Sequence, residues 1–144
     1  LSAFELNQKK LLAEIDARLN VEGKAMEKAF SLIRFYKQYD VFTLPLGGCP
    51  ILNVGVDAQH INPLLAAAVK ETVKEIEGKI ALVLENGVNS NEIRLSVPPL
   101  QFAKQLFTML QGSVAMTSMT RDRKYLINTA TYLEHLVKQE TNLF

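Results

Sequence analysis

Apolar residues recur every three or four positions along most of the chain, which is the spacing of one buried face of a helix. The pattern predicts five helices, with approximate bounds 2–19, 22–39, 63–86, 99–119 and 123–137. Only the stretch ILNVGV allows a short strand or, alternatively, a short buried helix. The sequence therefore predicts an all-α fold.

The ends of these segments carry recognisable start and stop signals. Asn62 and Pro63 form the clearest helix start, an N-cap side chain followed by a proline at the first helical position. Gly87 is expected to cap the end of the same helix. The stretch LGGCPILN, residues 46–53, holds two adjacent glycines and a proline, so we expect it to form a bend between helices.

The last two predicted helices carry more apolar surface than one small bundle needs to cover. Gly112 lies inside the first of them, where glycine costs about 1 kcal/mol relative to alanine, and close approach of another helix would offset that cost. A second copy of the chain is the expected cover, so the sequence predicts a homodimer. The predicted interface consists of Phe107, Leu110, Gly112, Val114, Tyr125, Thr129, Tyr132 and Leu136.

Composition narrows the classes of function. The 144 residues suit one domain, and 48% hydrophobic with 22% charged residues is usual for a soluble globular protein. A net charge of +1 without a basic stretch gives this chain itself no footprint for nucleic acid. No apolar run is long enough to span a membrane, and a single cysteine favours a reduced, cytoplasmic setting.

Motifs for catalysis or cofactor binding are not found. The segment GGCPILNVG matches neither of the two glycine motifs that bind phosphates, G-x-G-x-x-G and G-x-x-x-x-G-K-S/T. The two histidines, His60 and His135, form no metal-binding pair. Cys49 would lie near a helix N-terminus, where its thiol acts as a redox or electrophile sensor or simply fills a crowded bend. We therefore expect no enzyme, no cofactor and no metal, and a small all-α enzyme is the weakest alternative.

Most aromatic and methionine side chains are expected in the core, and a few suit a mostly apolar cavity edged by polar groups. The predicted ligand-binding residues are Phe30, Ile33, Arg34, Cys49, Asn53, Phe102, Leu106 and Met109. The expected ligand is a small, mostly apolar molecule.

Several segments, in this order, resemble the C-terminal regulatory domain of TetR-family transcriptional repressors. They are GCPILN, the long helix that begins NP and contains LAAAV, the ENG cap with its polar loop, and PPLQFAKQLFTMLQG followed by a last amphipathic helix. The resemblance covers about residues 25–137, and its most specific part is LQG at residues 110–112. It implies an antiparallel helical bundle over residues 1–144 that binds an effector and dimerises through its last two helices.

The resemblance also implies a mechanism. The family places a helix-turn-helix DNA-binding domain before this region, joined to it by the helix that matches residues 1–19, and we expect that domain upstream of Leu1. DNA is then bound only through that domain. A bound small molecule would bias the tilt of the first helix and so the spacing of the two recognition helices. The alternative is a stand-alone helical ligand-binding or scaffold protein with no role at DNA.

Overall fold

The computed structural model describes residues 2–58, 60 and 62–141. These residues form seven α-helices and one short 3-10 helix, and no strand occurs among them. The elements are α1 (Ala3–Leu19), α2 (Ala25–Tyr36), α3 (Tyr39–Thr43), η1 (Leu44–Leu46), α4 (Leu52–Ala58), α5 (Pro63–Asn89), α6 (Pro99–Thr120) and α7 (Lys124–Thr141). The all-α prediction is confirmed.

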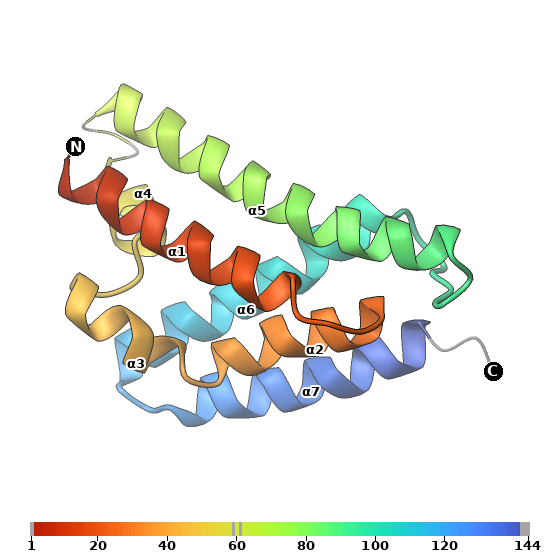
Figure 1. Cartoon of the computed structure of the whole chain (residues 1–144). Coiled ribbons are helices and arrows are strands. Elements are labelled where there is room, and N and C mark those ends of the chain that lie inside the picture. The colour runs from red at the N-terminus through yellow and green to blue at the C-terminus, as the bar shows by residue number, and fades with distance from the viewer. Residues whose placement is uncertain (1, 59, 61, 142–144) are drawn as a thin grey trace.

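The five long helices form an antiparallel bundle (Figure 1). In that view α1, α5 and α7 run from left to right, and α2 and α6 return in the opposite direction. The helix α6 packs against both α5 and α7, and α2 packs against α1, α5 and α7. The short elements α3, η1 and α4 close the left end of the bundle. The predicted antiparallel helical bundle is therefore confirmed.

Two helix starts show why the sequence folds locally as it does. At α1, the Ser2 hydroxyl accepts a hydrogen bond from the backbone N–H of Glu5 at 3.2 Å, and the Glu5 carboxylate accepts one from the N–H of Ser2 at 3.0 Å. This reciprocal pair satisfies two N–H groups that the helix itself leaves free. At α5, the Asn62 side chain accepts from the N–H of Leu65 at 3.2 Å, which confirms the predicted start.

The prediction that Gly87 ends a helix is wrong. The helix α5 continues to Asn89, and Gly87 lies buried inside it. A Cβ atom added to Gly87 would lie 2.6 Å from the Cβ of Ala25 at the start of α2, which is closer than two carbon atoms can pack. Glycine is therefore required here for the close approach of α2 and α5, and not for a cap.

Two further segments differ from the periodicity of the sequence. The predicted helix 22–39 is split into α2 and α3, because the chain turns after Tyr36 and resumes helical structure through Thr43. Of the two structures considered for ILNVGV, the short helix is the one found, as α4. In α7 the inward row consists of four residues with the spacing of one helical face, all of them buried in the core: Leu126, Ala130, Leu133 and Val137.

Candidate functional site

A cavity of about 490 Å³ lies where α3, η1 and α4 meet the end of α6 and the start of α7. This volume is in the range of sites for drug-sized molecules. Its apolar wall comes from five side chains of these elements: Tyr39, Leu44, Leu52, Val114 and Leu126. Its polar groups are Asp40, Thr43, Asn53, Thr117, Ser118, Arg121 and Arg123. The cavity therefore offers an apolar surface with a polar rim.

The turn from η1 to α4 shapes one side of the cavity. Gly47 and Gly48 adopt φ angles of 79° and 109°, which favour glycine because a side chain would be strained there. The N–H of Gly48 donates to the carbonyl of Thr43 at 3.0 Å, and the Asn53 amide donates to the carbonyl of Gly47 at 3.0 Å. The glycine-rich stretch is thus the bend that we expected, and it brings Cys49 and Asn53 to the cavity.

Cys49 belongs to a buried cluster with two tyrosines. Its sulfur lies 3.0 Å from the Tyr39 hydroxyl, and the rings of Tyr36 and Tyr39 stack with centroids 4.5 Å apart. Burial raises the pKa of Tyr36 well above its usual value, and nearby Cys49 adds to that rise. Burial also raises the pKa of Tyr39, with smaller contributions from Tyr36 and Cys49. Both phenols therefore stay protonated at neutral pH.

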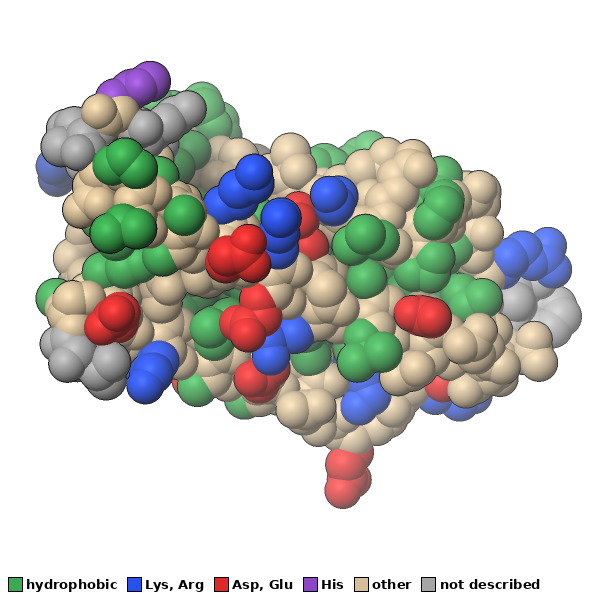
Figure 2. Space-filling model, turned by 90° about the horizontal axis from the view of Figure 1, so that it is seen from above, with side chains coloured by type: hydrophobic (Ala, Val, Ile, Leu, Met, Phe, Trp, Pro, Cys, Tyr) green, Lys and Arg blue, Asp and Glu red, His purple; other side chains and the backbone are tan. Residues whose placement is uncertain are grey.

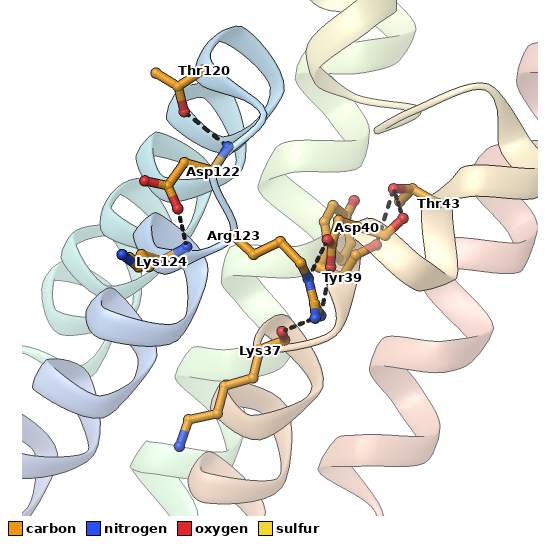
Figure 3. A network of polar contacts seen from close by, with 8 residues as sticks. All are labelled: Lys37, Tyr39, Asp40, Thr43, Thr120, Asp122, Arg123 and Lys124. Carbon is orange, nitrogen blue, oxygen red and sulfur yellow. Dashed lines mark hydrogen bonds and ion pairs between the residues drawn. The ribbon is translucent and has the colours of Figure 1, made fainter.

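An ion pair ties the α6–α7 turn to α3 (Figure 3). The Arg123 side chain donates to both carboxylate oxygens of Asp40, at 2.7 and 3.3 Å, and to the carbonyl of Lys37 at 3.4 Å. The hydrogen bonds to Asp40, and then its charge, raise the pKa of Arg123 above its ordinary value. In the same turn the Asp122 carboxylate accepts a hydrogen bond from the N–H of Lys124, the first residue of α7, at 3.0 Å.

Two of the eight predicted ligand-binding residues, Cys49 and Asn53, line this cavity. The other six do not. Four of those are buried in the hydrophobic core: Phe30, Ile33, Phe102 and Leu106. Met109 is half-buried against the core. The Arg34 guanidinium lies on the surface, above the Phe30 ring and 3.6 Å from the Glu134 carboxylate.

The eight residues predicted to form the dimer interface differ in how exposed they are in the single chain. Phe107, Leu110 and Val114 are buried within the single chain, and Val114 also lines the cavity. Thr129 and Leu136 are half-buried. The exposed members are Gly112, Tyr125 and Tyr132.

Further apolar side chains lie exposed on the same two helices. Met116 and Met119 on α6 and Ile127 on α7 were not among the predicted residues. The outward face of α6 and α7 is defined here by Gly112, Met116, Met119, Tyr125 and Tyr132.

Sequence reasoning missed the ionic part of the cavity. Asp40 and Arg123 are separated by 83 positions, so no local motif pairs them. The helix break TRDRK holds two arginines, but nothing in the local sequence indicates which element they contact. The charges over α1 and α5, in contrast, alternate in sign and form no basic field on that face (Figure 2).

Two further features bear on the type of site. Among the described residues, no group of three or more His, Cys, Asp or Glu side chains is arranged to hold a metal ion. None of the helices in the described part of the chain is both long and apolar enough to cross a bilayer.

Residues 25–133 match the family model for the tetracyclin repressor-like C-terminal domain. A TetR transcriptional regulator from Chloroflexus aurantiacus J-10-FL superposes with a TM-score of 0.87 at 21% identity, over 96% of this chain and 70% of that one. A TetR-family regulator from Cytophaga hutchinsonii gives 0.87 at 19%, over 98% and 70%. The reduced form of E. coli NemR gives 0.70 at 17%, over 96% and 72%. No curated protein matches the sequence.

Proposed function

Because the chain belongs to the TetR family of transcriptional regulators and matches their C-terminal domain, we propose that it is the effector-binding and dimerisation domain of a ligand-responsive repressor. The regulators of this family are not enzymes, in agreement with the absence of catalytic motifs from the sequence. The observation that carries the proposal is the cavity between α3, η1, α4 and the α6–α7 turn, which is of a size for a small effector.

Contacts from the cavity to α1 support a route for the response. Leu44 and Gly47 at the two ends of η1 line the cavity, and the carbonyl of Leu46 between them accepts a hydrogen bond from the Asn7 amide of α1 at 3.3 Å. An effector that displaces η1 therefore acts directly on α1. In this family that helix leads to the DNA-binding domain, so a change in its tilt alters the distance between the two DNA-binding heads of a dimer.

Polar contacts hold α1 against α5, so moving α1 costs free energy. The Thr72 hydroxyl donates to the Gln8 side chain at 2.8 Å in a buried site, and Lys79 forms an ion pair with Asp16 at 2.8 Å. A shift of α1 must break or rearrange these contacts. The effector lowers DNA affinity only to the extent that it binds the shifted state more tightly, and DNA weakens effector binding by the same factor.

The outward face of α6 and α7 supports dimerisation. Met119 is 71% exposed and Tyr132 is 56% exposed, although both carry large apolar groups. Large apolar side chains gathered on one face mark a protein interface. We propose that two copies pack this face against each other in a four-helix contact, and that the dimer acts in the cytoplasm on DNA through the preceding domain.

The test uses the full-length gene product. A helix-turn-helix encoded upstream of Leu1 would support the regulator, whereas a start codon adjacent to Leu1 would overturn it. DNA selected by the full-length protein from a random pool should be a two-fold symmetric site. Compounds that bind the protein are first identified because they raise its thermal midpoint. Such a compound should lower the affinity of the protein for this DNA site, measured by fluorescence anisotropy at fixed salt. Full-length protein that selects no DNA sequence contradicts the proposal.

A further inference from the structure

An arginine without an acidic partner stands at the rim of the cavity. Arg121 lines the cavity and forms no ion pair or side-chain hydrogen bond with any described residue. It is the C-cap of α6 with a φ of 60°, a left-handed position where glycine is the usual residue. In the part of the chain that the structure describes, Arg121 therefore brings a guanidinium without a counter-ion to the cavity rim.

The rest of the cavity wall does not neutralise that charge. Two arginines and one aspartate line the cavity, which leaves an excess of one positive charge. The aspartate, Asp40, is already bound through both oxygens by Arg123 (Figure 3). A cationic ligand would therefore find no free carboxylate in this wall, whereas an anionic ligand finds one free guanidinium.

A buried hydroxyl lies one helical turn from Arg121. Thr117 lines the cavity and is only 8% exposed, yet its hydroxyl has no hydrogen-bond partner among the described residues. Other helical threonines, Thr120 and Thr131 among them, donate to the carbonyl four residues earlier. Thr117 and Arg121 both line the same cavity, so a rotation about the Cα–Cβ bond of Thr117 would turn this free donor toward the region of the Arg121 guanidinium.

From these features we infer that the effector carries a single anionic group, a carboxylate or its equivalent, on an apolar body. Arg121 and Thr117 bind the anionic group, and Leu44, Leu52 and Val114 cover the body. The carbonyl end of α6 carries about half an elementary negative charge, which the full charge of the guanidinium exceeds. The inference rests on the proposed function, because it names the chemical class of the ligand of that cavity.

A matched pair of fluorescent probes tests it. The anion 8-anilino-1-naphthalenesulfonate and the neutral N-phenyl-1-naphthylamine share one aromatic frame, and both are titrated into the purified protein. Arg121→Gln should lower the affinity for the anionic probe about five- to tenfold, which is the usual loss for one charge-assisted hydrogen bond near a surface. The affinity for the neutral probe should fall less than twofold. Arg121→Lys should recover most of the lost affinity. The control Arg94→Gln, at an exposed position in the α5–α6 loop at the other end of the bundle, should change neither.

A second variant distinguishes a failure of this inference from a failure of the proposed function. Ser118 is exposed on α6 and lines the cavity, so Ser118→Phe should fill part of the cavity and weaken both probes. If Ser118→Phe affects neither probe, the cavity is not the binding site and the proposed function loses its support. If Ser118→Phe weakens both but Arg121→Gln leaves their affinity ratio unchanged, the cavity stands and the anionic class of ligand is wrong.

Discussion

Gly112 offers a sharp test of the dimer face. It lies within α6, it is exposed, and a Cβ atom added to it meets no atom of the described residues within 4 Å apart from the backbone of its own helix. Alanine at this position should therefore stabilise an isolated chain by about 1 kcal/mol through helix propensity. Among the described residues nothing explains the glycine, and the proposed dimer would explain it through the close approach of a partner helix.

If the outward face of α6 and α7 packs against its copy, Gly112→Ala places a methyl group from each protomer into a close contact. Overpacking costs about 1–3 kcal/mol per site, so two sites raise the dimer dissociation constant by about thirtyfold or more. Gly112→Leu should abolish the dimer at micromolar concentration. Sedimentation or light scattering reports the association, with a protomer mass of 16.1 kDa as reference.

The matched control is Gly78→Ala. Gly78 is an exposed glycine of α5, and by the same measure its added Cβ also meets none of the described residues within 4 Å. Both alanine variants should raise the free energy of unfolding of the single chain by about 1 kcal/mol, but only the one on α6 should weaken the dimer. Should both substitutions at Gly112 leave the dissociation constant unchanged, this face is not where two copies meet.

Two further predictions concern the core. Gly87→Ala should lower the free energy of unfolding by about 1–2 kcal/mol, because the added Cβ would lie 2.6 Å from the Cβ of Ala25 and this overpacking costs more than the gain in helix propensity. Urea titrations measure the change. If this variant is as stable as Gly78→Ala, the packing of α2 on α5 is contradicted. Tyr36→Phe should be neutral or stabilising at pH 7, since it removes a buried hydroxyl that has no hydrogen-bond partner among the described residues. The raised folded-state pKa of Tyr36 means that the unfolded chain loses this proton first, so native stability falls as pH rises above about 10, by up to about 1.4 kcal/mol per pH unit. Unfolding free energies at pH 9 and 11 should show a shallower loss in Tyr36→Phe, and identical losses would refute the assignment.

The helices could be predicted from sequence because their signals are local. Asn62 and Pro63 mark the start of α5 by chemistry that acts within one turn, and the inward row of α7 follows from periodicity alone. Gly87 was misjudged because a glycine that ends a helix and one that admits a neighbouring helix look alike in sequence. Only the position of Ala25, on another helix, distinguishes them.

The cavity could be predicted only in part, for a related reason. Periodicity shows that Phe30 and Phe102 are covered, but a core and a ligand cover an apolar side chain equally well. Cys49 and Asn53 were found because the glycine turn beside them signals a bend. Arg123 was missed because its partner Asp40 lies 83 positions earlier in the chain, and a contact of that range leaves no trace in local spacing.

The burial of Leu110 and Val114 follows from the central place of α6 in the bundle. Because α6 packs against both α5 and α7, a wide arc of its surface is covered within the chain, and only a narrow strip through Gly112, Met116 and Met119 is left outward. The same two turns direct Thr117 into the cavity. An effector in the cavity and a second copy of the chain would therefore contact α6 on two different sides of the same helical turn. Under the proposed function, effector affinity and dimer affinity are then linked through this part of α6, and each changes the other by the same factor.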